Sequence, residues 1–188
     1  VVGEAHFHRV GGRRALGGLL LHEVGHRRGP LPHLFGEAAV HGDGSRLDAE
    51  FDIQFSPRLE EAVNRGVALH FVVEFELSKP RWYWFSEKPV HLSRTYKITY
   101  TPLLRQYRLS FGAAYQNFNH FEEVVGALSR VRGWPVAEGG ALRKQDEYEA
   151  AIRMRLDTTQ LPKPFQLNAV ASNDWNLASD WYRWTVRP

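Results

Sequence analysis

The sequence contains no cysteine among its 188 residues. This absence excludes disulfide bonds, thiol nucleophiles and zinc sites with cysteine ligands, but it does not fix the compartment, because exported proteins can also lack cysteine. Long apolar runs are missing as well: no stretch approaches the roughly 20 residues that a helix needs to cross a bilayer. We therefore expect a folded chain without a transmembrane segment.

Common signatures of nucleotide and ester chemistry are also absent. The chain has no Walker A loop, no G-x-G-x-x-G turn and no G-x-S-x-G elbow, which are the usual marks of nucleotide-binding proteins and serine hydrolases. An excess of one charge is lacking too, because 24 basic and 21 acidic residues leave a net charge of +3. Charge this balanced does not indicate binding to nucleic acid, even with a pI near 9.3. We predict no nucleic-acid partner and no cofactor.

The clearest positive signal is alternation of apolar and polar residues. From Val67 to Leu77 every odd position carries a large apolar side chain, whereas His70, Glu74 and Glu76 occupy even positions. Only an extended strand places such a set on one face. The same alternation occurs in four further stretches: 46–55, 96–100, 107–111 and 148–156. These patterns predict a mainly β protein, an antiparallel β-sandwich with immunoglobulin-like layering.

Two short helices are predicted to cover the sandwich. The first has Ser56 as N-cap, Pro57 in its first turn and Gly66 as its stop. The second starts at a capping box of Asn119 and Glu122, and a later glycine, at position 133, is expected to end it.

Two further interpretations concern the surface and the tail. Arg153 and Arg155 are expected to pair with the acidic outer face of the 46–55 strand, which carries Asp48, Glu50 and Asp52. In the tail, Phe165 and Leu167 alternate with polar residues before an irregular loop.

Domain boundaries follow from a change in composition. Residues 34–188 are predicted to form a single β-sandwich domain. Residues 1–33 are rich in Gly, His and Arg without either periodicity, which indicates a flexible N-terminal arm. Arg13 and Arg14 followed by 15–21 resemble the start of a secretory signal, but charged residues interrupt the apolar stretch. We interpret the arm as a signal-peptide remnant or a mis-assigned gene start.

One catalytic motif occurs within this arm. His22, Glu23 and His26 match H-E-x-x-H, in which two histidines one helical turn apart bind zinc and the glutamate activates water. The third histidine of the longer metzincin pattern is out of register, because Pro32 occupies its place. Nearby glycines also weaken the helix that such a site requires. A zinc-dependent hydrolase or peptidase, with His22 and His26 as ligands and Glu23 as base, is the alternative to a chance match.

An aromatic run from Arg81 to Phe85 is the stronger candidate for a functional surface. In an extended segment Trp82 and Trp84 share one face while Tyr83 and Phe85 share the other, so a sheet covered on one side cannot bury both pairs. Either another part of the chain covers the second face, or the run is a platform for a peptide, glycan or partner protein. For the second case we predict Arg81, Trp82 and Trp84 as contact residues.

Several ordered stretches resemble the domain-of-unknown-function family 4390. They are Glu76-Leu77-Ser78-Lys79-Pro80-Arg81-Trp82-Tyr83-Trp84-Phe85, Arg94-Thr95-Tyr96, Arg105-Gln106-Tyr107-Arg108-Leu109-Ser110, Leu161-Pro162-Lys163-Pro164-Phe165-Gln166-Leu167-Asn168-Ala169 and Trp175-Asn176-Leu177-Ala178-Ser179-Asp180-Trp181. The resemblance covers about residues 34–186. It implies an exported, periplasmic bacterial protein of no established activity, with an accessory role beside a sensor kinase of the nitrogen-regulation type. It supplies no catalytic residues, and the arm departs from the intact signal peptide of the family.

The function that we expect is therefore a non-catalytic envelope protein that binds a protein partner or another ligand. The zinc hydrolase and a glycan-binding module remain as alternatives. The sequence does not indicate the identity of the ligand or the oligomeric state.

Overall fold

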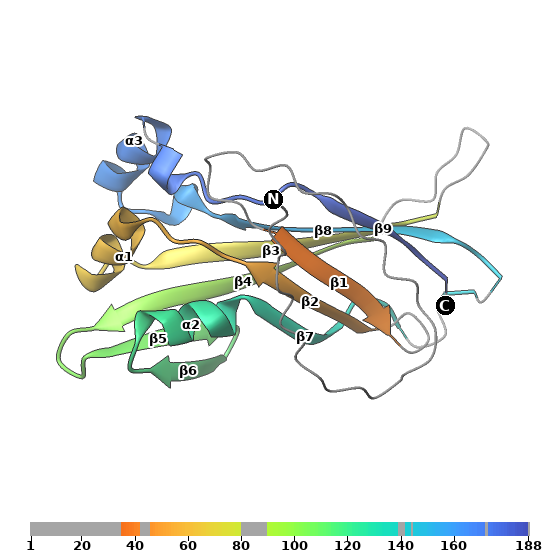
Figure 1. Cartoon of the computed structure of the whole chain (residues 1–188), viewed down its shortest axis with the longest axis horizontal. Coiled ribbons are helices and arrows are strands. Elements are labelled where there is room, and N and C mark those ends of the chain that lie inside the picture. The colour runs from red at the N-terminus through yellow and green to blue at the C-terminus, as the bar shows by residue number, and fades with distance from the viewer. Residues whose placement is uncertain are drawn as a thin grey trace, which may run out of the picture. The chain divides into compact units, whose positions relative to one another are not determined.

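A computed structural model describes residues 35–41, 46–79, 90–138, 142–143, 145–171 and 173–187. These ranges contain the strands β1 (Phe35–His41), β2 (Arg46–Asp52), β3 (Leu69–Ser78), β4 (Val90–Thr101), β5 (Gln106–Phe111), β6 (Ala114–Phe118), β7 (Arg130–Pro135), β8 (Tyr148–Leu156) and β9 (Tyr182–Val186). The helices are α1 (Pro57–Asn64), α2 (Phe121–Leu128) and α3 (Lys163–Ala171), with two 3₁₀ turns, η1 (Thr158–Gln160) and η2 (Asn173–Trp175). The prediction of a mainly β protein is confirmed (Figure 1).

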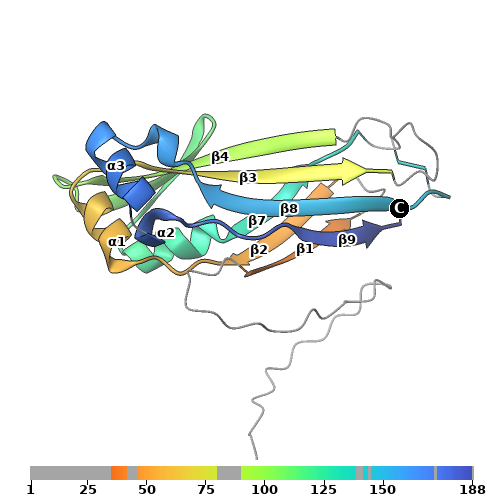
Figure 2. The ribbon, with the colours of Figure 1, turned by 90° about the horizontal axis from the view of Figure 1, so that it is seen from above.

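The strands form two antiparallel sheets. The larger sheet has the order β6-β5-β4-β3-β8-β9, and the smaller sheet has the order β1-β2-β7. β3 lies inside the larger sheet, where Phe71 pairs with Tyr96 of β4 on one side and with Leu156 of β8 on the other. Figure 2 shows β1 and β2 in a second layer beside the larger sheet, with α1 and α2 at the same end. Immunoglobulin-like layering stays a prediction, as does the domain boundary at residue 34.

Alternation along the strands builds one hydrophobic core. The odd-numbered side chains of β3 from Leu69 to Leu77 are buried, and those of Leu47, Ala49 and Phe51 on β2 belong to the same core cluster. Direct contact between the sheets is made by Phe75 and Trp134 of β7, whose ring centroids lie 6.2 Å apart. The two-residue period therefore identifies the faces that the sheets turn toward each other.

One charged residue lies on the inner face of the larger sheet. Arg94 of β4 pairs with Val73 of β3 and so shares the face of the buried residues. Its guanidinium carbon lies 4.4 Å from the ring centroid of Phe111 and 4.8 Å from that of Trp134. Such cation–π geometry lets an arginine fill a gap between two sheets while its charge faces electron-rich rings.

The structure confirms the residues predicted at both ends of the first helix, α1. The Ser56 hydroxyl accepts a hydrogen bond from the Leu59 N–H at 3.3 Å, and Gly66 follows the helix with a φ of +89°. That backbone angle lies in the left-handed region, which glycine adopts without steric cost.

The second predicted helix was correct in place but wrong in detail. Glu123, rather than Glu122, accepts hydrogen bonds from the backbone N–H groups of Asn119 and His120, at 3.1 and 3.2 Å. α2 ends at Leu128, and Gly133 lies inside β7 with a φ of +55°. The helix stops early because the chain continues as β7, which pairs with β2 in the smaller sheet and buries Val131 and Trp134.

Phe165 and Leu167 alternate with polar residues in the sequence, but they belong to the helix α3 and not to a strand. The Pro162 carbonyl accepts hydrogen bonds from the N–H groups of Phe165 and Gln166, at 2.8 and 3.2 Å. The Gln166 side chain donates in turn to two backbone carbonyls of the preceding turn. These local bonds favour a helix, so the described residues hold three α-helices rather than two.

The expected arginine pairing was also wrong. Arg153 and Arg155 bond to Glu74, because β8 neighbours β3 and not β2. Glu50 on β2 instead meets two arginines of β7, and the closer of these contacts is 3.1 Å from Arg132.

Replacement of Phe75 by alanine tests the contact between the sheets. Phe75 is fully buried and meets both Trp134 and Trp184. We expect Phe75→Ala to lower the free energy of unfolding by about 3–5 kcal/mol, measured by urea denaturation, because it leaves a cavity between the sheets. The control Thr95→Val, at an exposed position of β4, should change it by less than about 0.5 kcal/mol. A loss below about 1 kcal/mol for Phe75→Ala would contradict this assignment.

Candidate functional site

The site residues predicted from sequence lie outside the described part of the chain. Arg81, Trp82 and Trp84 fall in the range 80–89, and the H-E-x-x-H motif falls in the range 1–34. Both assignments therefore stay predictions. Among the described residues, no three His, Cys, Asp or Glu side chains gather closely enough to hold a metal ion. No described helix is long and apolar enough to cross a membrane.

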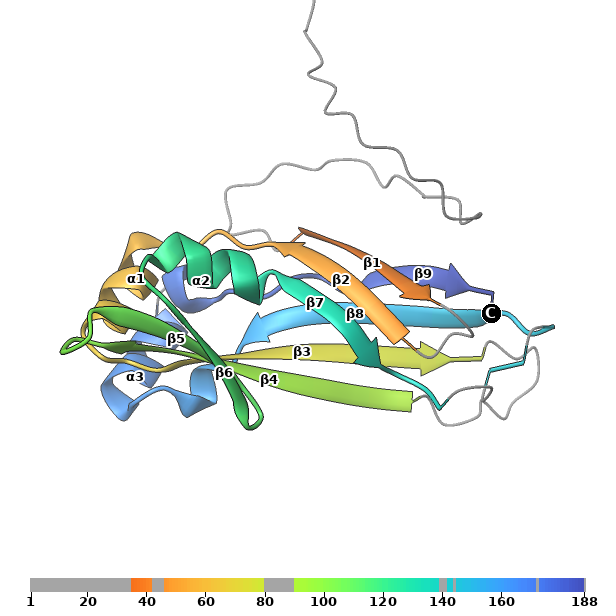
Figure 3. The same cartoon turned by 90° about the horizontal axis from the view of Figure 1, so that it is seen from below.

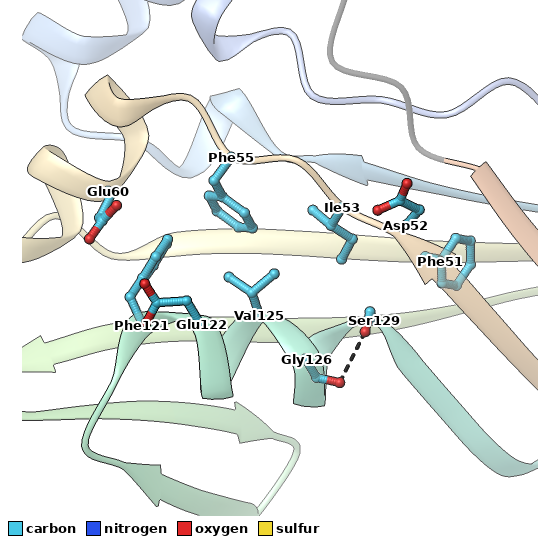
Figure 4. A pocket seen from close by; sticks show the side chains of 10 residues that line it. All are labelled: Phe51, Asp52, Ile53, Phe55, Glu60, Phe121, Glu122, Val125, Gly126 and Ser129. Atoms are coloured by element: carbon cyan, nitrogen blue, oxygen red, sulfur yellow. Dashed lines mark hydrogen bonds between the residues drawn. The ribbon is translucent and has the colours of Figure 1, made fainter. Parts of the chain in front are cut away.

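The described residues do form an open pocket between α1, α2 and the segment that leaves β2 (Figure 4). Its volume is about 400 Å³. The lining residues are Phe51, Asp52, Ile53, Phe55, Glu60, Phe121, Glu122, Val125, Gly126 and Ser129. They come from two stretches that are distant in the sequence, 51–60 and 121–129, so no single motif encodes the pocket.

Aromatic contacts build the apolar wall of the pocket. The ring of Phe55 meets that of Phe121 edge to face, with centroids 5.0 Å apart and an interplanar angle of 85°. Phe55 also contacts Phe71 of β3 at 5.5 Å, which anchors it to the core. Both contacts have the T-shaped arrangement that aromatic pairs prefer. The wall is therefore held in place before any ligand binds.

A backbone hydrogen bond links β2 to the end of α2, and a side-chain bond closes that end. The Phe51 N–H donates to the Ser129 carbonyl at 2.8 Å. The Ser129 hydroxyl donates to the Gly126 carbonyl at 3.0 Å, as Figure 4 shows. These bonds satisfy polar groups at the C-terminal end of the helix, where carbonyls lack helical partners. The bond from Phe51 also fixes β2 beside the end of α2 at one side of the pocket.

Carboxylates form the rim. Asp52 and Glu122 are exposed and Glu60 is half-buried, and the described lining contains no basic residue. Within the described ranges, no Lys or Arg lies within salt-bridge distance of these three carboxylates. The rim is therefore negative at neutral pH.

The negative charge of the rim affects the pKa of a neighbouring phenol, that of Tyr107. Tyr107 donates a hydrogen bond to the Asn64 Oδ1 at 2.5 Å, and its ring centroid lies 5.5 Å from that of Phe121. Burial raises the pKa of Tyr107, and the charges of Glu60 and Glu122 raise that pKa further. Glu60 and Glu122, on opposite sides of the pocket, thus both act on the pKa of Tyr107.

The two glutamates on the outer face of β3 are held by cross-strand partners. Glu74 accepts a bond from the Arg155 Nη2 at 3.0 Å and another from Arg153. Partial burial acts to raise the pKa of Glu74, but the hydrogen bonds and charges of both arginines outweigh it and hold that pKa below its usual value. Glu76 faces His91 of β4 at 3.4 Å. Glu74 thus stays charged and links β3 to β8. A general acid would instead have to be protonated in order to donate its proton.

Comparison with known families assigns the chain to one of them. A family model described as a domain of unknown function, DUF4390, matches residues 37–185. The chain belongs to the DUF4390 family. This result confirms the resemblance inferred from the ordered motifs. Neither the curated proteins nor the solved structures include a match to the chain.

Every lining residue of the pocket falls within the segment that matches DUF4390. The pocket is therefore part of the DUF4390 domain and not of the N-terminal arm. The sequence contained one usable signal: Phe55 continues the inward alternation of β2 beyond the end of that strand, so a further element had to cover it. The identity of that element, α2, depends on tertiary structure.

Removal of the Glu74 charge should affect stability in a pH-dependent way. Because the folded-state pKa lies below the value of 4.5 for an unperturbed group, the charged form stabilises the fold above that value, and this contribution is lost as pH falls through the folded-state pKa. We expect Glu74→Gln to cost about 1–3 kcal/mol at pH 7 and much less near pH 3, measured by urea unfolding. Glu138→Gln, at an exposed position, is the matched control. An equal deficit at both pH values would contradict a role for the charge.

Proposed function

We propose that this DUF4390 protein is a non-catalytic binding module whose pocket holds an apolar, positively charged segment of a partner protein. The observation that carries the proposal is the combination of an aromatic wall with three rim carboxylates that have no basic neighbour among the described residues. Complementary charge of this kind speeds association and selects partners, whereas the apolar wall supplies affinity.

The dimensions favour a short segment. A volume of about 400 Å³ lies at the low end of the range for ligand sites, which is about 300–1,000 Å³. An aliphatic or aromatic side chain of the partner would contact Phe55, Phe121 and Val125. A lysine or arginine beside it would reach Glu60 or Glu122, which stand on opposite sides of the pocket (Figure 4).

The setting of this module is also a proposal. The family resemblance supports a periplasmic location and an accessory role beside a sensor kinase. Two antiparallel sheets that share one core support an immunoglobulin-like sandwich as the scaffold. Arg81, Trp82 and Trp84 are proposed as a second contact surface for the same partner. No observation on the described residues favours the zinc hydrolase or the glycan-binding module.

Fluorescence anisotropy with a labelled peptide tests the pocket. The probe carries a phenylalanine and a leucine between two lysines, and a matched probe carries glutamates in place of the lysines. We expect only the cationic probe to bind. The double variant Glu60→Gln/Glu122→Gln should weaken its binding about two- to thirtyfold, because each rim pair contributes about 0.2–1 kcal/mol. Val125→Trp should abolish binding because the indole fills the pocket.

Glu138→Gln is the control for this experiment, since it removes one negative charge at an exposed position outside the pocket. It should leave the affinity for the cationic probe unchanged. Equal weakening by Glu138→Gln would indicate unspecific attraction to the whole surface. That result, or equal binding of both probes, would refute the proposed site.

The aromatic run is tested by thermal unfolding. If Trp82 contacts a partner and not the core, Trp82→Ala should shift the Tm by no more than about 2 °C. Trp134→Ala, which removes a buried ring, should lower it by about 6–20 °C for comparison. A similar large shift for Trp82→Ala would assign that side chain to the core and remove it from the proposed contact surface.

A further inference from the structure

β6 forms one border of the larger sheet and pairs only with β5 among the described strands (Figures 1 and 3). Four of its five residues are exposed, and Tyr115 exposes 63% of its surface. A border strand presents a row of unpaired backbone N–H and C=O groups, which can add another strand. β6 is therefore a free edge within the described part of the chain.

This edge is short, but it lacks the charge, the proline and the bulge that protect many border strands. Residues 109–119 contain no charged side chain, although 24% of the whole chain is charged. Natural proteins protect border strands with charge, proline or a bulge. Two other edges show such features: β7 has two arginines and Pro135, and β9 has Arg183. The absence of protection on β6 indicates an edge that pairs with another strand.

The hairpin geometry shows which backbone groups are available. β5 and β6 are joined by the two-residue turn of Gly112 and Ala113, and Gly112 has a φ of +55°, as the first position of a type II′ turn requires. Residues next to such a turn form a hydrogen-bonded pair, and bonded and non-bonded pairs then alternate. The N–H and C=O groups of Tyr115 and Asn117 therefore point away from β5.

We propose that β6 pairs in antiparallel fashion with β6 of a second copy of this chain, about a two-fold axis that passes beside Gln116. In this register Tyr115 faces Asn117 of the second copy, and their outward backbone groups form the new ladder. Gln116 faces Gln116 of the second copy, and an amide can pair with itself because it carries both donors and acceptors. Ala114 faces Phe118 of the second copy, which places a small side chain against a large one.

The self-complementarity of these pairs favours a second copy over an unrelated strand. A two-fold axis brings each residue near its own counterpart, so any charge at Gln116 would meet a like charge. The uncharged sequence of β6 meets this condition. Because a five-residue edge buries less than the roughly 1,200 Å² of a stable interface, the dimer is reversible and depends on protein concentration. This inference is independent of the proposed ligand pocket.

Analytical ultracentrifugation of the full 188-residue chain from micromolar to millimolar concentration tests the proposal. Wild-type protein should pass from monomer to dimer as its concentration rises. Gln116→Lys and Gln116→Glu should each stay monomeric at concentrations where wild type is at least half dimeric. An equimolar mixture of the two variants should recover the dimer, because opposite charges then face each other. Thr95→Lys, at an exposed position of the central strand β4, should dimerise like wild type.

Three outcomes would overturn the proposal. A monomeric wild type over the whole concentration range would exclude the dimer. A dimer that Gln116→Lys leaves unchanged would place the interface elsewhere. Failure of the mixed variants to associate, with native circular dichroism for both, would show that β6 does not face its own copy. Amide hydrogen exchange gives a second readout, since Tyr115 and Asn117 should become protected only at high concentration of wild-type protein.

Discussion

The structure depends on one apolar layer between two sheets. The smaller sheet has only three strands, and the apolar inner face of β2 is buried by contact with β3 and its neighbours. Phe75 and Trp134 make this contact directly, and Arg94 extends it by inserting between Trp134 and Phe111. A three-stranded sheet that lacked this layer would expose its apolar face and lose its main source of stability.

The pocket is a consequence of this layer. α2 connects β6 of the larger sheet to β7 of the smaller sheet, so it lies where the two sheets meet. Its buried side chains, with Phe121 first, join the shared core, which leaves its acidic face toward solvent. α1 follows β2 in the same way and supplies Glu60. The negative rim thus arises from the polar faces of two helices, which supply Glu60 and Glu122, and from Asp52 at the end of β2.

Sequence patterns predicted the elements that bury one face more fully than the other. β2, β3 and β8 have this property, and alternation located all three. β6 was missed because it is exposed on both faces, and β7 was missed because Gly133 interrupts its pattern. The partner of Arg153 could not be predicted without the strand order, and the pocket could not be predicted because its residues come from separate elements. The N-cap of α1 at Ser56, in contrast, could be predicted from the local sequence alone.

Native-state hydrogen exchange tests the shared layer most directly. If one core holds both sheets, the most protected amides of β2 and β7 should require the same free energy of opening as those of β3 and β8, with the same dependence on denaturant. The two sheets would then open only by global unfolding. A distinctly lower free energy for β2 and β7, with its own weaker denaturant dependence, would show that the smaller sheet opens alone and would contradict the account.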